Sequence, residues 1–440
     1  MKPMPLARRL QRFFAALTPA PDRCWVAFSG GGDSTALLYL MVELAGDFDW
    51  SLGMVHVHHG LLPEAEAWAT RARDLASRLH LPVQVFSVQA RPRPGESPEA
   101  AAREARYAAW RDWLAEGEVI VTAHHADDQA ETLLLQLLRG AGPHGLAAMP
   151  AVAPLGRGRL VRPLLEVPRG EVRSWARSKG LGWVEDPSNR ELRHDRNYLR
   201  HQVMPVLEAR WPSLARTLHR AAELQAEAAG LLDALAAQDL AVAGEGDRLR
   251  VSVLTRLAPA RQRNLLRGWI ARHGHPLPSR AVLERIRCDL PGARRDAMPC
   301  VRWARSEVRR YRDRLYLLEA LPDAVPPPVA DWDLEPLVFP GLGRTLRLVP
   351  AVGQGIAVHC LERGGWSVRF RQGGERIRPA GQAHHRPLKH LLQEAGVPPW
   401  ERRFLPLVYW KDRLVAVPGI CVAEGWQARE AAPGRLPVWG

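Results

Sequence analysis

The chain has 440 residues, 46% of them hydrophobic, with a formal net charge of +14 and a pI near 10.4. This length is enough for about two or three domains, each with its own core. The excess of positive charge favours a polyanionic partner, which charge alone does not assign to a nucleic acid or an anionic membrane. Lysine occurs at only four positions. Arginine suits phosphates and bases, although a biased genomic base composition would give the same excess.

Cysteine usage and the N-terminus indicate a cytoplasmic protein. The five cysteines are widely spaced and form no C-x-x-C pair, which favours reduced thiols over disulfides or structural zinc: Cys24, Cys288, Cys300, Cys360 and Cys421. No run of 18 apolar residues exists, so we expect no membrane span. The basic, amphipathic start around Leu6, Leu10 and Phe14 predicts a first helix rather than a signal peptide.

Residues 1–210 alternate short β-rich runs with helical stretches, beginning with CWVAFS at 24–29 and STALLYLMVEL at 34–44. This alternation predicts an α/β domain with a doubly wound parallel sheet and helices on both faces. Ligands of such sheets bind at the carboxyl ends of the strands. Three runs end there in polar groups, SGGGDS (29–34), HVHHG (56–60) and TAHHADD (122–128).

The remaining chain divides by composition. Residues 211–320 are rich in Ala, Leu and Arg with helical periodicity, which predicts a mainly helical middle domain. Residues 321–345 begin with a proline-rich stretch and are predicted to be a stiff linker. Residues 346–440 contain β-like runs and one basic helix, and we expect a small α+β domain with two strands around the WKDR turn at 410–413.

The glycine-rich segment follows a predicted buried strand and precedes a helix. Its glycines let backbone N–H groups approach an anion, and the helix N-terminus adds a positive dipole end. The segment lacks the Walker A lysine and the G-x-G-x-x-G pattern. Instead, S-G-G-x-D-S resembles the PP-loop of ATP pyrophosphatases, which implies ATP binding by Ser29, Gly30, Gly31, Gly32, Asp33 and Ser34. The alternative is a plain turn with Asp33 and Ser34 as helix caps.

Asp127, Asp128 and Glu131 occupy the first turn of a second predicted helix. Carboxylates there complement the helix dipole, which is the simpler interpretation. Because this turn lies at the same sheet edge as Asp33, Asp33 and Asp128 could instead share a magnesium ion that bridges ATP phosphates. Five histidines flank these segments, and without a recognisable thiol or carboxylate partner we expect hydrogen bonds around the nucleotide rather than zinc: His56, His58, His59, His124 and His125.

Several segments in one order resemble the bacterial tRNA(Ile)-lysidine synthetase family. They are SGGGDS, HVHHGL, TAHHADDQAET, the stretch from RPLLEVPRGEV to EDPSN, and RNYLRHQVMPVL. RFRQGGERIRPAG and RPLKHLLQEAGVPPW are similar to the C-terminal domain of that family. The likeness covers nearly the whole chain and implies an adenine nucleotide alpha hydrolase-like, PP-loop fold for the first domain. One departure is that the C-terminal helix has Arg386 and Lys389 where family members often carry several lysines.

The resemblance implies a carbon–nitrogen ligase that uses ATP and magnesium. The C2 oxygen of the wobble cytidine in a CAU-anticodon tRNA(Ile) would be adenylated with release of pyrophosphate. The ε-amine of L-lysine would then expel AMP, which changes the codon read from AUG to AUA. Asp33, Asp128 and Arg196 would be catalytic, Asp33 and Asp128 would bind the metal, and the substrates would contact Asp127, Glu131, Asn197 and Arg200. Asp186 and Asn189 are further candidates, although residues 186–189 are also a good turn sequence.

Contact with tRNA also requires a surface far from the wobble base. The C-terminal candidates are Arg369, Arg371, Arg376, Arg378, Arg386 and Lys389, interleaved with Trp366, Phe370 and Trp400. For each arginine taken alone, a solvated surface residue is the favoured interpretation. The rival functions are a tRNA thiolase of the same fold, which generally needs paired cysteines, a PP-loop amide ligase acting on a small molecule, and a catalytically inactive RNA-binding protein. The oligomeric state stays open.

Overall fold

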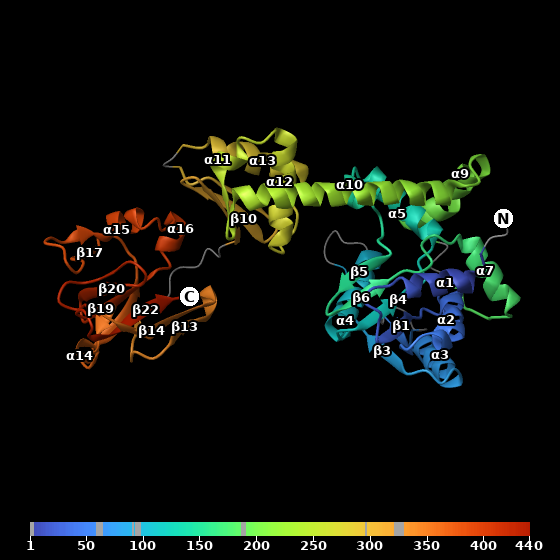
Figure 1. Cartoon of the computed structure of the whole chain (residues 1–440), viewed down its shortest axis with the longest axis horizontal. Coiled ribbons are helices and arrows are strands. Elements are labelled where there is room, and N and C mark those ends of the chain that lie inside the picture. Colours follow the sequence, from blue (N-terminus) through green and yellow to red (C-terminus); the bar gives the residue numbers. More distant parts are fainter. Residues whose placement is uncertain are drawn as a thin grey trace. The chain divides into compact units, whose positions relative to one another are not determined.

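The computed structural model in Figure 1 describes residues 4–58, 65–89, 92, 98–185, 191–294, 297–320 and 330–440. The chain forms two compact units, Met1–Leu232 and Asp233–Gly440. The first unit is therefore longer than the expected domain of residues 1–210, because the first part of helix α10 (Leu214–Ala243) belongs to it. Among the described residues, no helix is both long enough and apolar enough to span a membrane.

The first unit is built on a six-stranded sheet in the order β3-β2-β1-β4-β6-β5. All neighbours are parallel except β5 and β6, which form an antiparallel edge. The strands are β1 (Arg23–Ala27), β2 (Ser51–His58), β3 (Val83–Ser87), β4 (Glu118–Val121), β5 (Val152–Leu155) and β6 (Gly158–Val161). The predicted parallel α/β domain is confirmed, with the antiparallel edge as an addition that the sequence patterns do not distinguish.

Alternating strand residues supply two cores, one on each face of this sheet. Cys24 and Val26 of β1 pack with helices α1 (Leu6–Ala15), α2 (Gly32–Leu44), α3 (Ala65–Arg78) and α7 (Arg169–Ser178). Trp25, between them, packs on the opposite face with Trp110 of α4 (Pro98–Trp113). This period of two, with helices covering both faces, fixes the register of the sheet and holds the carboxyl ends of β1 and β4 side by side.

The remaining helical elements of the first unit lie in the connections between the strands and after the sheet. Helix α5 begins at the carboxyl edge of the sheet, after β4, and the chain returns to that edge after α7. These elements are η1 (Ala45–Asp47), α5 (Ala126–Leu138), α6 (Pro143–Leu146), α8 (Asp195–Tyr198), the π-helical turn η3 (Leu199–Val203) and α9 (Met204–Arg210).

The middle segment combines helices with a five-stranded antiparallel sheet in the order β7-β8-β11-β10-β9. Its helices are α11 (Val251–Leu254), α12 (Pro259–Arg272) and α13 (Arg280–Gly292), and its strands are β7 (Gly244–Glu245), β8 (Arg248–Arg250), β9 (Cys300–Trp303), β10 (Ser306–Tyr311) and β11 (Arg314–Glu319). Trp269, fully buried, lies in their common core. The segment is therefore less helical than its Ala- and Leu-rich composition indicates.

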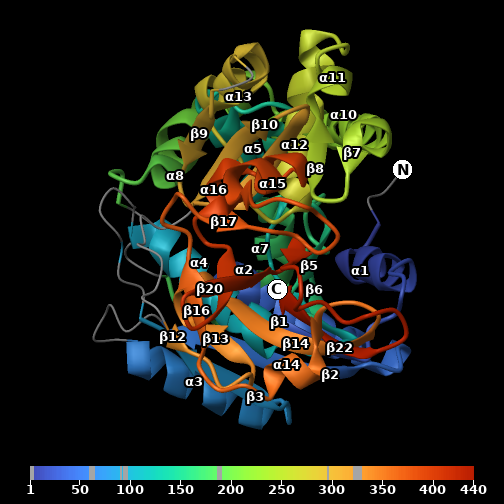
Figure 2. The same ribbon diagram turned by 90° about the vertical axis from the view of Figure 1, so that its left-hand side faces the viewer.

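The C-terminal part is α+β, as predicted, and its described residues form two larger sheets and the two-stranded sheet of β17 and β18. One larger sheet has the order β12-β16-β19-β20-β21 and the other β13-β14-β22-β15, with β14 and β22 paired along their length (Figure 2). Its strands are β12 (Ala330–Asp331), β13 (Leu337–Phe339), β14 (Arg344–Val352), β15 (Ile356–Ala357), β16 (Trp366–Phe370), β17 (Arg376–Ile377), β18 (Arg386–Pro387), β19 (Pro406–Trp410), β20 (Arg413–Val417), β21 (Cys421–Val422) and β22 (Pro433–Trp439). Its helices are α14 (Val358–Leu361), α15 (Leu388–Glu394) and α16 (Pro399–Arg402), besides the short 3-10 turn η4 (Pro340–Leu342).

The start of this part differs from the sequence-based boundary at 346. Strands β12 and β13 lie inside the range 321–345 that was predicted to be a linker, and they pair with β16 and β14. Phe339 of β13 is buried in the C-terminal core, so residues from 330 onward belong to that core rather than to a linker. The proline-rich residues 321–329 lie outside the described part of the chain. The hairpin of β19 and β20 around Lys411 and Asp412 confirms the two predicted strands.

Candidate active site

The glycine-rich loop joins the end of β1 to the first turn of α2. Gly30 has φ +85°, a left-handed conformation that an L side chain rarely adopts. The Ser34 hydroxyl accepts a hydrogen bond from the Ser29 backbone N–H at 3.2 Å and donates to the Gly31 carbonyl at 2.9 Å. The loop is thus closed on itself by its two serines, while the first N–H groups of α2, which have no intrahelical partners, face outward. This is the geometry of an anion cradle.

A strap formed by residues 183–185 crosses the loop. The Val184 N–H donates to the Gly30 carbonyl at 3.1 Å, and the Trp183 ring lies so close to Gly32 that an added Cβ would be 3.1 Å from it. Two cavities meet at this crossing. One, of about 290 Å³, is lined by Ser29, Gly31, Gly32, Asp33, Ser34, Arg169, Arg173, Trp183, Val184, Glu185, Arg200 and His201. The other, of about 190 Å³, is lined by Phe28, Ser29, Gly30, Gly31, Trp68, Arg71 and Val184.

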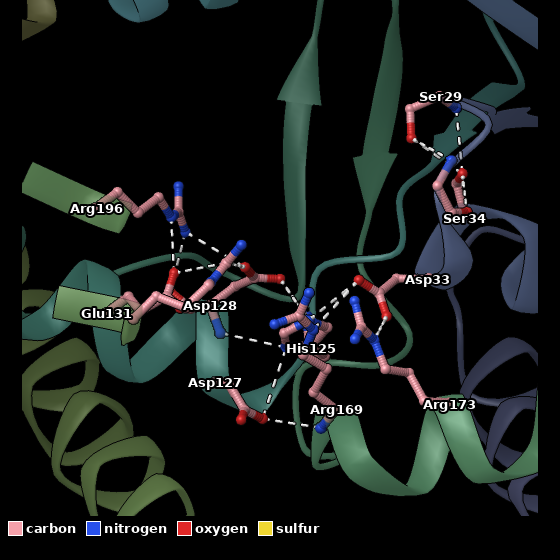
Figure 3. A network of polar contacts seen from close by, with 12 residues as sticks. Ser29, Asp33, Ser34, His125, Asp127, Asp128, Glu131, Arg169, Arg173 and Arg196 are labelled. Carbon is pink, nitrogen blue, oxygen red and sulfur yellow. Dashed lines mark hydrogen bonds and ion pairs between the residues drawn. The ribbon is translucent and has the colours of Figure 1, made fainter. Parts of the chain in front are cut away.

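His125 joins the loop to the acidic helix start (Figure 3). It is the N-cap of α5, where its ring accepts from the Asp128 N–H and its own N–H donates to the Asp128 carboxylate at 3.1 Å. Its Nε2 lies 3.7 Å from Asp33 Oδ2 and 3.3 Å from Asp128 Oδ2, and its Nδ1 lies 3.7 Å from Asp127 Oδ2. One buried imidazole therefore brings together the three aspartates that sequence analysis placed at the same sheet edge.

The pKa values of His125, Asp33 and Asp128 are shifted by burial and by the charged groups beside them. Burial disfavours the imidazolium, but the carboxylates of Asp128 and Asp33 outweigh it and raise the pKa of His125. For Asp33, burial acts to raise the pKa, yet the His125 ring and the guanidinium groups of Arg169 and Arg173 lower it overall. The pKa of Asp128 is lowered in the same way by His125 and Arg196 against burial. The site therefore favours ionised Asp33 and Asp128, and these carboxylates in turn favour a proton on the His125 ring.

Glu131 fixes two arginines rather than facing a cavity. Its side chain is 2% exposed. Arg200 donates to it from Nε at 2.7 Å and from Nη2 at 2.8 Å, and Arg196 donates from Nε at 2.9 Å. Arg200 also donates to Asp128 Oδ1 at 2.9 Å. Both carboxylate oxygens of Glu131 are occupied, so it positions Arg196 and Arg200 beside Asp128 instead of contacting a ligand.

Two arginines of α7 were missed by the sequence analysis. Arg169 Nε lies 3.7 Å from Asp33 Oδ2, and Arg173 Nε lies 3.7 Å from Asp33 Oδ1 (Figure 3). The Arg169 backbone N–H donates to Asp127 Oδ2 at 2.8 Å, which secures the start of α7 at the acidic turn. The two arginines are four residues apart, so they lie on one face of the helix, next to the buried Val172. This spacing is visible in the sequence and could have indicated the pair.

Comparison with known proteins agrees with this architecture. Residues 3–207 match the PP-loop domain model, 249–316 the TilS substrate binding domain and 366–439 the TilS substrate C-terminal domain. The tRNA(Ile)-lysidine synthase of Alkalilimnicola ehrlichii is 50% identical over 96% of this chain and 94% of that protein. Those of Coxiella burnetii and Methylococcus capsulatus are each 44% identical, over 96% and 98% of this chain and 94% and 98% of theirs. The chain belongs to the tRNA(Ile)-lysidine synthase family.

Other candidate residues of the first unit make hydrogen bonds within the protein. The Asn197 side chain donates to the Glu191 carbonyl at 3.1 Å and so holds the loop before α8. His56, which is buried, makes a hydrogen bond of 2.8 Å with the Phe28 carbonyl, and His124 one of 2.8 Å with Thr122 Oγ1. Within the described ranges, no histidine of the two motifs belongs to a group of three side chains placed for a metal ion. His59, Asp186 and Asn189 lie outside the described residues.

The C-terminal candidates of this lysidine synthase family member gather around one hairpin. Arg376 of β17 and Arg386 of β18 lie on paired strands, with Arg378 just after β17 and the exposed Lys389 at the start of α15. Arg371 is nearby in sequence and lies 3.5 Å from Glu375. The hairpin therefore presents Arg376, Arg378, Arg386 and Lys389 on one small element of the second unit.

The prediction that aromatic residues lie among these arginines on the tRNA-binding surface is wrong. Trp366, Phe370 and Trp400 are all buried, because they fill the cores of the second unit and cannot stack on RNA bases. Cations stack instead on half-buried rings of β19, with the Arg369 guanidinium 4.4 Å from the Tyr409 ring centroid and the Lys411 amine 4.8 Å from that of Trp410. Sequence pattern alone does not separate an aromatic of the core from one of the surface.

Proposed function

We propose that this chain ligates L-lysine to C2 of the wobble cytidine of a CAU-anticodon tRNA(Ile), at the expense of ATP, with AMP and pyrophosphate as products. The observation that carries the proposal is that the PP-loop and Asp33 line one cavity, and that the His125-centred acidic turn lies directly beside Asp33. The family membership and the names of the curated relatives support the same reaction. The basic charge of the chain fits an RNA substrate.

ATP fits the two cavities that share the loop. The cavity with Phe28 and Trp68 offers aromatic surface for the adenine, and the cavity with Ser34 and Asp33 offers N–H donors and positive charge for the phosphates. Gly30 and Gly31 lie at the crossing, so the bond between the α and β phosphates would lie over the loop. The backbone N–H groups at the start of α2 would then be available to stabilise charge on the reacting phosphate.

Magnesium fits Asp33 better than Asp128. Asp33 Oδ1 is buried and makes no hydrogen bond, which suits a carboxylate ligand to a hard cation. Both oxygens of Asp128 already accept hydrogen bonds, from the His125 N–H and from Arg200. We therefore assign Asp33 as the metal-binding carboxylate and Asp128 as a partner that holds His125 and Arg200. When bound, magnesium would neutralise charge on the departing pyrophosphate.

The chemistry proceeds by two displacements. The C2 oxygen of cytidine attacks the α-phosphorus, and the bond to the β-phosphate oxygen breaks, so that pyrophosphate leaves. The neutral ε-amine of lysine then attacks C2, and the C2–oxygen bond breaks, so that AMP leaves. Adenylation turns a poor leaving oxygen into a good one, and the site contributes by orienting the reactants and stabilising the phosphate charge. Arg196 and Arg200, fixed by Glu131, would face that charge.

The deciding experiment measures AMP release from purified protein with ATP, magnesium and L-lysine, with and without a CAU-anticodon tRNA(Ile) transcript. AMP release that needs both lysine and tRNA supports the proposal. AMP release without tRNA would identify a small-molecule ligase, and no AMP in any mixture would contradict ATP-dependent ligation altogether. Asp33→Asn should abolish turnover and leave tRNA retention on a filter nearly unchanged, whereas loss of both would indicate misfolding.

A further inference from the structure

Helix α7 places two arginines at the cavity of about 290 Å³ that is lined by the PP-loop. Val172 and Ala176 of this helix are fully buried in the core, so the helix is fixed along its other face. Arg169 and Arg173 lie one turn apart, and their side chains are about one quarter exposed. Both line the cavity that also contains the loop serines and Asp33. Figure 3 shows both guanidinium groups close to the Asp33 carboxylate.

The contact between these three side chains is incomplete. Each Nε lies 3.7 Å from an oxygen of Asp33, which is an ion pair but too long for a hydrogen bond. Arg169 Nε, Arg173 Nε and Asp33 Oδ1 are all buried atoms without a hydrogen-bond partner. Buried donors and acceptors of charged groups are costly to leave unpaired. We take this to mean that Arg169, Arg173 and Asp33 each have a better partner in another state of the protein.

Arg200 differs from this pair although it lines the same cavity. Its Nε and Nη2 donate to Glu131 and Asp128 at 2.7 to 2.9 Å, so three of its five N–H donors are committed to these carboxylates. Arg169 and Arg173 therefore have more donors to offer a ligand than Arg200 has. Guanidinium groups bind phosphate oxygens bidentately, and the cavity between them and the N–H groups of the loop suits a polyphosphate.

We propose that Arg169 and Arg173 bind the pyrophosphate end of ATP. When ATP binds, their guanidinium groups leave Asp33 and pair with the phosphate oxygens. The identity of the anion rests on the proposed function. In the free protein the two arginines neutralise Asp33 and so oppose a cation at that carboxylate. Once phosphate oxygens pair with the two arginines, Asp33 no longer has these partners and can bind a metal ion. Anion and cation then bind cooperatively, because each removes a partner that competes with the other.

The exchange predicts opposite effects on anion and cation binding, which a structural role for the arginines would not produce. We would measure the affinity for inorganic pyrophosphate by calorimetry, without metal, lysine or tRNA. Arg169→Gln and Arg173→Gln should each weaken it about tenfold, and Lys substitutions should restore part of the loss. Arg177→Gln is the matched control, because Arg177 is exposed on the same helix one turn further on.

The second arm uses Mn²⁺ as the metal probe, followed by electron paramagnetic resonance in the absence of nucleotide and pyrophosphate. The double Gln variant should bind Mn²⁺ more tightly than the unaltered protein, and Asp33→Asn in that background should remove the gain. Neither arm contains lysine or tRNA, so failure of ligation would not affect them, and their failure would leave ligation standing. A folded double variant with pyrophosphate affinity within about twofold of normal, or with unchanged Mn²⁺ affinity, would overturn the exchange.

Discussion

Arg200 and Glu131 form a two-point ion pair, with Nε to Oε1 at 2.7 Å and Nη2 to Oε2 at 2.8 Å, beneath the candidate active site. The carboxylate is 2% exposed, so its charge is sustained only by Arg200 and Arg196. The pair connects α5, which carries the acidic turn, to the π-helical turn η3. Short π-helical turns occur often at functional sites, and here the turn places Arg200 and His201 at the cavity.

Glu131→Gln should therefore cost stability as well as activity. Removing one partner of a buried pair leaves the other charge uncompensated, and we expect the free energy of unfolding to fall by about 3 kcal/mol. Denaturant titration measures this loss. Glu43→Gln removes the partner of Lys179 in an exposed pair and should change the free energy by less than about 1 kcal/mol. Equal effects of the two substitutions would contradict a positioning role for Glu131.

Gly32→Ala should damage nucleotide binding through a clash rather than through backbone strain. The new Cβ would lie 3.1 Å from the Trp183 ring, so either the strap or the PP-loop must move. Overpacking of this kind costs about 1 to 3 kcal/mol, and we expect ATP affinity to fall about tenfold. Gly46→Ala is the control, because its Cβ would meet no atom within 4 Å. Combining Gly32→Ala with Trp183→Leu should restore affinity, and no recovery would argue against this clash.

The raised pKa of His125 makes stability depend on pH. A group whose pKa is higher in the folded state adds stability that is complete below its ordinary value of 6.5 and is lost as pH rises through the raised value. The free energy of unfolding should thus be highest below pH 6.5 and fall as the pH rises above it. His125→Asn keeps an N-cap acceptor but loses the charge, and it should flatten this profile. Urea titrations across the range would show it, and a variant with the same slope as the unaltered protein would refute it.

Particular residues show which parts of the candidate site could be predicted from the sequence. Ser29 to Ser34 could be predicted as an anion loop because the strand, the glycines and the helix start are contiguous, so local chemistry decides the conformation. The sheet edge that unites Asp33 with Asp128 follows from the strand and helix alternation. The central role of His125 could not be predicted, because it depends on a tertiary contact between the starts of α2 and α5 that leaves no periodic pattern in the sequence.

Burial limits prediction in the second unit. Trp366 and Trp400 look like stacking platforms in a basic segment, yet both lie in hydrophobic cores, where their large apolar area is removed from water. Strands β7 and β8 of the middle sheet escape notice because they are only two and three residues long, too short for a pattern of alternation. Pairing with distant strands, rather than local propensity, makes these segments extended.

Asp127 offers a test that separates a structural carboxylate from a metal ligand. Its Oδ2 accepts the Arg169 N–H at 2.8 Å and so caps the first turn of α7. Asp127→Asn retains an oxygen acceptor and should keep near-normal stability and turnover, whereas Asp127→Ala should lose about 1 kcal/mol, as other lost caps do. Thermal unfolding and AMP release report both quantities. If Asp127→Asn abolished turnover with stability unchanged, its charge would be acting on a ligand instead.

The hairpin of β17 and β18 should act on tRNA binding alone. Lys389 is exposed beside it, and a phosphate contact there contributes through the release of counterions. Lys389→Gln should lower the slope of log affinity against log salt by about one and leave the ATP affinity unchanged. Arg347→Gln, at an exposed position of β14 in the same unit, is the charge-matched control. Filter binding of labelled tRNA over a range of salt measures the slope, and equal slopes for the two variants would mean that the hairpin contributes only general positive charge.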